Sequence, residues 1–158
     1  MAAMSWLHRP FALLALLLLT ASTAWAGVRD DNPNLVGGEI LGRGILATLN
    51  YERFLTNAVG LGGGVMAVAG GGETGIIAPF YLSLLTGDEN SLYTSAGVTY
   101  VGGGDAQDFQ NQALVTLSIG YHHQSKGGFF VRPLFTYMVA ADTGDWLIWP
   151  GMTIGGSF

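Results

Sequence analysis

Apolar and polar residues alternate along most of the chain beyond residue 38, which is the pattern of a strand with one face of each kind. In the segment 113–122, every second residue is apolar and most of the residues between are small or polar. The same two-residue period recurs in 45–52, 59–67 and 148–158. In 113–122 the apolar set is Ala113, Val115, Leu117, Ile119 and Tyr121, and the other face carries Thr116, Ser118, Gly120 and His122.

Turn-forming residues divide this pattern at intervals of roughly 10 to 15 residues, a spacing typical of consecutive β-hairpins. Seven such breaks predict eight strands, all in one domain, and no helical period of useful length intervenes. The breaks are GRG (42–44), LTNA (55–58), GGGET (70–74), TGDENS (86–91), GGGDAQDFQN (102–111), SKGG (125–128) and DTGD (142–145).

The first 26 residues have the pattern of a cleaved secretory signal peptide. Arg9 precedes the apolar run 11–21, and the small-x-small triplet Ala24-Trp25-Ala26 follows it. The apolar run is shorter than the roughly 20 residues that a membrane-spanning helix needs. We therefore expect two parts: residues 1–26, removed during export, and a single β-barrel domain over 27–158.

Composition narrows the class of this exported domain. The chain has no cysteine, so disulfides cannot hold it together, and all 25 glycines fall after residue 26, which argues against helices. After residue 26 there are 5 Lys and Arg against 11 Asp and Glu, because Arg9 is the one charged residue before it. This negative balance argues against binding to nucleic acid.

The polar face of the strands indicates which side is the interior. It consists mostly of Gly, Ser, Thr and Asn, and charged residues are only 11% of the chain, against about 25% in soluble domains. Small polar residues suit the narrow lumen of an eight-stranded barrel. The sequence therefore predicts an all-β, eight-stranded antiparallel up-and-down transmembrane β-barrel; a soluble periplasmic, lipocalin-like binding barrel is the alternative.

The chain ends inside its last alternating segment, at Phe158. A closed barrel needs its last strand to pair with its first, because unpaired backbone groups are costly in hydrocarbon. With eight strands both termini lie on the periplasmic side. We therefore expect Phe158 to face outward at the inner interface, and the segments 42–44, 70–74, 102–111 and 142–145 to lie outside the cell.

Two stretches, GEILGRGILATLNYERFLTN (38–57) and IGYHHQSKGGFFVRPLFTY with WPGMTIGGSF (119–137, 149–158), resemble a family of small bacterial outer-membrane β-barrel proteins of unassigned activity. The resemblance implies this fold and a location in the bacterial outer membrane, reached after export through the inner membrane. It also implies that Phe158 belongs to the signal read by the barrel-assembly machinery. Gly156 departs from that signal, because a bulky apolar residue is usual there.

Three charged residues are predicted to point into the lumen: Glu39, Glu52 and Arg132. A lone charge there is costly and an ion pair is tolerable. We expect Arg132 to bridge toward Glu52 or Glu39 in a structural network. Arg53, next to Glu52, is expected to face outward and reach lipid head groups.

Candidate chemistry is sparse. His123 and Ser125 have the His-x-Ser spacing of lipid A deacylases, so an outer-membrane hydrolase that uses them is an alternative function. The neighbouring His122 points to the opposite strand face, so the two histidines cannot easily share a metal ion. We expect no cofactor, no metal and no catalysis, and a structural or interaction role.

The expected partners are outer-membrane lipids, lipopolysaccharide and, during insertion, the barrel-assembly machinery. Acidic residues of the predicted outer loops could hold a divalent cation between lipopolysaccharide phosphates, although solvated loops explain them more simply. These residues are Glu73, Asp105, Asp108, Asp142 and Asp145.

Overall fold

The computed structural model describes residues 27–70, 73–103 and 111–158. The predicted signal peptide lies outside these residues, as do Asp105 and Asp108. The elements in chain order are α2 (Val28–Asp31), β1 (Asn34–Leu41), the 3₁₀ turn η1 (Gly42–Gly44), β2 (Ala47–Phe54), β3 (Val59–Gly70), β4 (Glu73–Gly87), β5 (Asn90–Gly103), β6 (Gln112–Gln124), β7 (Phe129–Ala140) and β8 (Trp146–Ser157).

The eight strands form a closed barrel in which each strand pairs antiparallel with its neighbours in the sequence, and β8 pairs with β1. This confirms the predicted fold class and strand number. At the seam, Glu39 lies opposite Thr153, and the backbones of Asn34 and Phe158 exchange two hydrogen bonds of 2.9 Å each. The last strand of the barrel therefore closes the wall by pairing with the first.

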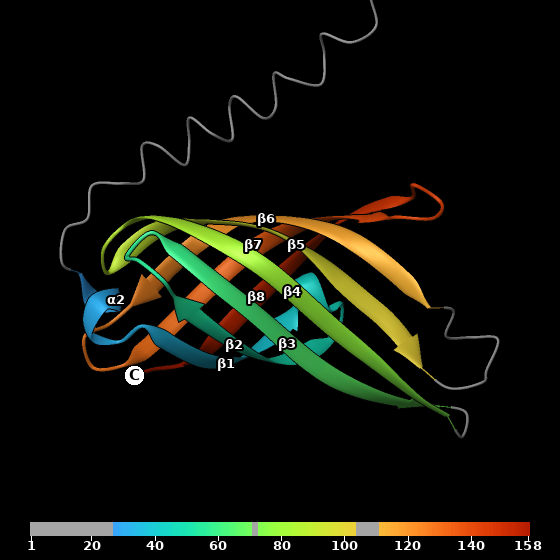
Figure 1. The fold of residues 1–158 in the computed structure, drawn as a ribbon, viewed down its shortest axis with the longest axis horizontal. Helices are drawn as coiled ribbons and strands as arrows, with labels where there is room; N and C mark the ends of the chain where they lie inside the picture. Colours follow the sequence, from blue (N-terminus) through green and yellow to red (C-terminus); the bar gives the residue numbers. More distant parts are fainter. Residues whose placement is uncertain (1–26, 71–72, 104–110) are drawn as a thin grey trace, which may run out of the picture.

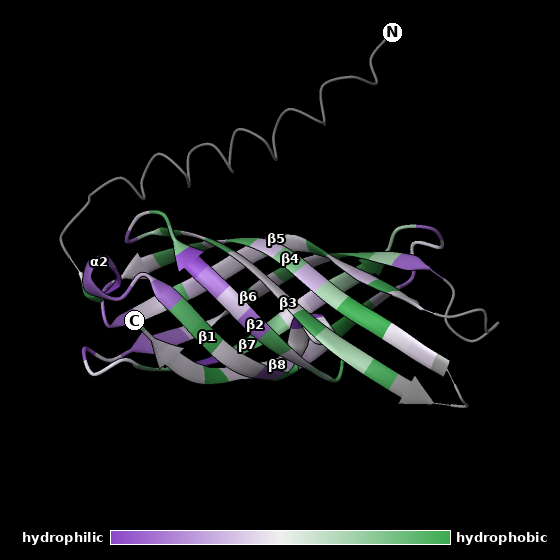
Figure 2. Ribbon diagram, turned by 60° about the horizontal axis from the view of Figure 1, so that its bottom comes forward, coloured by the Kyte–Doolittle hydropathy of each residue, from purple (hydrophilic) through white to green (hydrophobic). Residues whose placement is uncertain are grey.

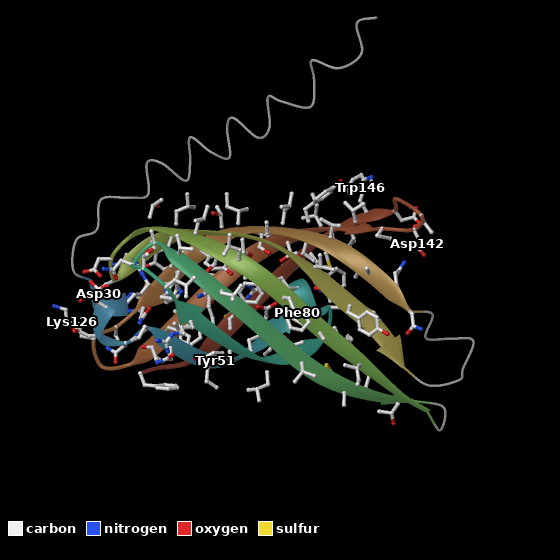
Figure 3. The ribbon with its side chains drawn as sticks, in the orientation of Figure 1. Asp30, Tyr51, Phe80, Lys126, Asp142 and Trp146 are labelled. Atoms are coloured by element: carbon white, nitrogen blue, oxygen red, sulfur yellow. The ribbon has the colours of Figure 1, made fainter. Side chains whose placement is uncertain are left out.

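The two ends of the barrel differ, and we call the end that carries Phe158 proximal and the opposite end distal. The proximal end carries α2, Phe158 and the turns at 55–58, 88–89 and 125–128, and the distal end carries the turn at 141–145 (Figure 1). Asp30 and Lys126 lie at the proximal end, and Asp142 and Trp146 lie at the distal end (Figure 3). Both termini of the barrel domain thus lie at one end, as an even strand number requires.

The apolar faces of the strands point outward and the polar faces point inward. On β6, Leu117 is 52% exposed and its neighbour Ser118 is 5% exposed. On β8, Ile154 is 44% exposed and Thr153 is 2% exposed. Apolar and polar residues alternate along the ribbon in Figure 2. The burial pattern confirms the expected alternation and its direction.

The strands are unequal in length, and this opens the wall at the distal end. The β1–β2 pair is short, and β3, β4 and β5 extend past it (Figure 1). Pairing of β2 with β3 stops at Leu49 and Val65, and pairing of β1 with β8 stops at Leu41 and Gly151. Beyond these points, residues 66–70 of β3 and 146–150 of β8 each pair on one side only.

Among the residues that the structure describes, no helix has the length and apolar character that crossing a membrane would require.

Candidate functional site

A network of buried charged and aromatic side chains fills the proximal and middle parts of the lumen. Arg132 of β7 and Glu52 of β2 face each other across it, with Arg132 Nη1 2.7 Å from Glu52 Oε2. Ser83 donates a hydrogen bond from its hydroxyl to the other carboxylate oxygen of Glu52. Arg132 is 0% exposed and Glu52 is 2% exposed, so water screens this pair little.

The guanidinium of Arg132 makes two further contacts. Its Nε donates to His122 Nδ1 at 3.1 Å, so His122 carries its proton on Nε2, which lies 3.3 Å from Gln124 Oε1. Its Cζ lies 4.0 Å from the centroid of the Tyr93 ring, a cation–π distance. Among the described residues, Arg132 Nη2 has no hydrogen-bond partner. The guanidinium of Arg132 is therefore held by the His122 ring and the Tyr93 ring as well as by the Glu52 carboxylate.

Glu39 pairs with Arg43 and not with Arg132. Its carboxylate accepts from the Arg43 backbone N at 2.7 Å and from Nε at 3.1 Å, and it forms an ion pair with Nη2. Thr153 Oγ1 donates to the same carboxylate at 3.0 Å. Of the three charges that the sequence predicts to point inward, the structure brings Glu52 and Arg132 together. Glu39 has a different partner, Arg43, which was not among the predicted inward charges.

The expectation that GRG (42–44) forms an outer hairpin turn is wrong. Gly42, Arg43 and Gly44 are all buried, because η1 folds into the barrel. Arg43 lies over the Tyr81 ring at 3.7 Å and donates to the Tyr93 hydroxyl at 2.7 Å. An arginine flanked by two glycines was the available signal, since glycine permits a backbone to enter a crowded lumen.

Gly42 shows why this turn needs glycine. Its φ is +66°, in the left-handed region, and a Cβ there would lie 2.8 Å from Glu39 Oε1. The carbonyl of Arg43 accepts from Thr99 Oγ1 at 3.0 Å, and the indole Nε1 of Trp149 donates to the Ile45 carbonyl at 3.0 Å. These hydrogen bonds fix η1 as an inward plug near the middle of the barrel.

Arg29 of α2 fills the proximal end of the lumen, and sequence reasoning missed it as well. It is 1% exposed and donates to the carbonyls of Asn57 and Asp88 at 2.5 and 2.7 Å, and also to that of Gly87. Burial lowers the pKa of Arg29, and the nearby Asp88 carboxylate opposes that shift. The arginine therefore ties α2 to the turns between β2 and β3 and between β4 and β5.

The predicted hydrolase residues do not form a catalytic pair. His123 Nδ1 lies 2.9 Å from Asn90 Oδ1. The Ser125 hydroxyl instead donates to the Phe129 carbonyl at 3.2 Å and accepts from the Phe129 N–H at 3.1 Å. Within the described chain, neither side chain hydrogen bonds to the other or to a carboxylate. His123 lies near the end of β6, and Ser125 holds the tight turn that follows.

The described residues contain no group of three or more potential metal ligands. Of the acidic loop residues, Asp142 accepts from Gln112 Nε2 at 3.1 Å and from the Thr143 N–H at 2.8 Å. These hydrogen bonds hold the pKa of Asp142 below its ordinary value. Asp145 accepts from Thr143 Oγ1 at 2.8 Å. Both carboxylates are exposed and make local loop contacts.

An apolar groove of about 360 Å³ lies where β6, β7 and β8 meet. Pairing of β6 with β7 is interrupted beside Pro133, between Gly120 opposite Leu134 and His123 opposite Val131. The groove opens on the outer surface of the barrel, among the exposed apolar side chains. It is lined by Gly120, Tyr121, Pro133, Leu134, Phe135, Pro150 and Gly151.

The wall and its filled lumen define the class of this protein: a closed, eight-stranded, up-and-down antiparallel β-barrel with an ion-paired interior and an apolar exterior. The crystal structure of the N-terminal β-barrel domain of Pseudomonas aeruginosa OprF is similar, with a TM-score of 0.59 and 16% sequence identity. The match covers 77% of this chain and 94% of that one. No protein-family model and no curated protein sequence matches the chain.

Proposed function

We propose that this chain is an integral protein of the bacterial outer membrane, with a role in structure or interaction and without catalysis. The observation that carries the proposal is the belt of large apolar side chains on the barrel exterior, which includes Leu49, Phe80, Leu117 and Phe135 at 52–63% exposure. Burying such a belt in hydrocarbon is favourable by about 25 cal/mol per Å².

The position of the charges supports the same proposal. Among the described residues, the exposed charged side chains belong to α2 and the end turns, apart from Arg53. Arg53 lies one residue from the proximal end of β2, where Nη1 donates to Asn34 Oδ1 at 3.0 Å. In a membrane, this places Arg53 at head-group level, where a long cationic side chain is tolerated.

The interior supports a closed barrel. Arg29, Arg132 and Arg43 follow one another along the lumen, and their hydrogen bonds hold protein groups across it. Such a barrel anchors a surface in the membrane and does not conduct solutes through an open pore. Export through the signal peptide (1–26), insertion by the barrel-assembly machinery through Phe158, and contacts with outer-membrane lipids and lipopolysaccharide complete this proposal.

Neither alternative function has comparable support. A hydrolase at His123 and Ser125 needs a hydrogen-bonded pair and an orienting carboxylate, and the contacts above provide neither. A soluble lipocalin-like barrel needs a polar exterior and an apolar cavity, whereas the proximal interior carries Glu52 and Arg132.

Cell fractionation and spin labels together test the proposal. We expect the protein to resist extraction by salt and carbonate and to require detergent. A label at Leu117→Cys should report contact with hydrocarbon, and a label at Lys126→Cys should report water. Recovery in the salt-washed soluble fraction, or a water-exposed label at Leu117, would contradict membrane insertion.

A further inference from the structure

The interior of the barrel changes character beyond η1. Six apolar residues there share one inner face, because residues opposite each other in antiparallel strands point to the same side. Ile77 is paired with Met66 and Val101, Met138 with Leu147, and Leu114 with Ala140. We call the following set the distal inner face: Met66, Ile77, Val101, Leu114, Met138 and Leu147.

This face is less covered than the lumen around the ion pairs. Leu147 is 47% exposed, and Met66, Val101 and Leu114 are partly exposed, although all four point inward. In the proximal half, Leu35, Leu85 and Phe130 are also inward-facing, and each is 1–2% exposed. The described side chains therefore fill the proximal lumen and leave part of the distal inner face uncovered.

The wall beside the distal inner face also lacks continuous strand pairing. The short β1–β2 pair leaves residues 66–70 of β3 and 146–150 of β8 as the two borders of a gap in the wall. Each border keeps backbone N–H and C=O groups without a strand partner on that side. Pro150 lies on one border, a position where proline is tolerated because no ladder N–H is needed.

From this geometry we infer that the distal inner face binds an acyl chain of a membrane lipid, which enters through the gap between β3 and β8. The inference rests on the proposed function, because it requires the outer wall to lie in a bilayer. The gap joins the apolar exterior, represented by Ile148 at 57% exposure, to the apolar inner face at Leu147. The residues of β3 and β8 that border this passage, 66–70 and 146–150, are uncharged.

The chemistry of the gap fits a lipid better than a purely apolar ligand. Unpaired backbone groups are costly in hydrocarbon, and the ester or amide groups between a lipid's head and its chains can bond to them. Five strand residues at about 3.3 Å each, tilted by about 40°, rise about 13 Å, close to the depth of one leaflet of a hydrocarbon core about 30 Å thick. The plug η1 limits how deep the chain can enter.

Single-cysteine spin labels test this inference cleanly, because the natural chain has no cysteine. The protein is refolded in vesicles of phosphatidylethanolamine and phosphatidylglycerol, and each label's accessibility to oxygen and to a water-soluble nickel complex is measured. The probe is Leu114→Cys on the distal inner face. Val115→Cys, its outward neighbour, and Ser118→Cys, inward in the filled lumen, are the controls.

We expect high oxygen and low nickel accessibility at both Leu114 and Val115, and low accessibility to both reagents at Ser118. A label at Leu114 that is accessible to nickel means a water-filled face, and one that is closed to both reagents means a face covered by protein; either result overturns lipid binding. A nickel-accessible label at Val115 overturns membrane insertion itself, so the two failures are distinguishable.

A photo-reactive phospholipid, with a diazirine near the end of one acyl chain, identifies the occupant. We expect adducts on the peptides that carry Met138 and Leu147. Leu147→Ala should lower the yield at Met138 about fivefold, equivalent to about 1 kcal/mol, while Ile148→Ala on the outer face should leave it unchanged. Adducts confined to outward residues, such as Tyr121 and Phe135 of the outer groove, would refute binding inside the barrel.

Discussion

The proximal and distal halves of the barrel interior differ in both polarity and burial. The proximal half holds Arg132, Glu52 and His122 at 0–2% exposure, whereas the distal half presents apolar residues such as Leu147 at 47% exposure. The difference follows the strand lengths: eight strands surround the ion pairs, and six continue past them. A closed wall keeps a charged network dry and tightly held, whereas the interrupted wall surrounds apolar side chains that need no countercharge.

The proximal charges also show how a narrow lumen accommodates ions. Each carboxylate accepts from an arginine and from a hydroxyl, Ser83 for Glu52 and Thr153 for Glu39. Buried ions need hydrogen bonds to their remaining lone pairs as well as a countercharge. The distal half needs no such arrangement, because its inner face carries few polar groups.

The largest effect is expected from removing one member of the ion pair in the proximal half. Arg132→Met leaves Glu52 charged and buried, which should lower the free energy of unfolding by about 3–5 kcal/mol. Neutralising the partner too, with Glu52→Gln, should recover much of that loss. Urea unfolding of the refolded protein in detergent measures both, and equal midpoints for wild type and the single variant would contradict the network.

A pair of leucine truncations compares packing in the two halves directly. Leu134 is 3% exposed and Leu147 is 47% exposed. Leu134→Ala should cost about 2–4 kcal/mol because it leaves a cavity, whereas Leu147→Ala should cost less than about 1 kcal/mol in detergent. The same unfolding measurement tests them. Similar losses for the two variants would show that the distal inner face is as fully packed as the lumen.

Arg29, which fills the proximal end of the lumen, should contribute less to the free energy of unfolding than the ion pair between Arg132 and Glu52. Arg29→Ala removes charged hydrogen bonds to three carbonyl groups, and we expect a loss of about 2 kcal/mol together with faster amide exchange in the turn at 88–89. Lys126→Ala is the control at the same end, because its side chain is 81% exposed and lies 3.8 Å from Glu89. That variant should change stability by less than about 0.5 kcal/mol.

Two glycines of the first hairpin provide a matched test of the inward turn. Gly42→Ala places a Cβ in the left-handed region beside Glu39 and should cost about 1–2 kcal/mol. Gly38→Ala is the control, since a Cβ there meets no atom within 4 Å. Equal stability of the two variants would show that η1 does not need its inward conformation.

The smallest effect is expected at the distal rim. Gln112→Ala removes the main cause that lowers the pKa of Asp142, so that pKa should rise toward its ordinary value. The stabilisation from this contact is present above the ordinary pKa of aspartate and is lost as pH falls through the lower folded value. At neutral pH the variant should lose this stabilisation, but the loss should be too small to measure, because Asp142 is exposed and water screens the contact. The carboxyl resonance of Asp142, followed by NMR as a function of pH in both proteins, tests this.

The sequence predicted the wall better than the interior. The strand breaks follow from local turn chemistry, and the two faces follow from alternation, so both can be read from neighbouring residues. The inward direction of Glu39, Glu52 and Arg132 could be predicted in the same way. The partner of Glu39 could not, because Arg43 lies in a turn, where alternation gives no direction.

Arg29 was missed for a related reason. It lies in a four-residue helix before the first strand, and its partners are carbonyls near residues 57 and 87–88. Nothing in its local sequence distinguishes a plug from a solvated arginine. Only the closure of the barrel brings those turns around one side chain.

The sequence by itself determined a closed wall of eight strands with apolar residues outward. Turn residues and alternation are local signals, and the small polar residues of the other face fit a narrow lumen. The tertiary structure alone decided where the arginines lie, which carboxylate each one binds, and where the wall is open. These depend on strand register and unequal strand length, which bring together residues far apart in the chain, such as Arg132 and Glu52. Local pattern fixes the direction of a side chain, and only long-range packing fixes its partner.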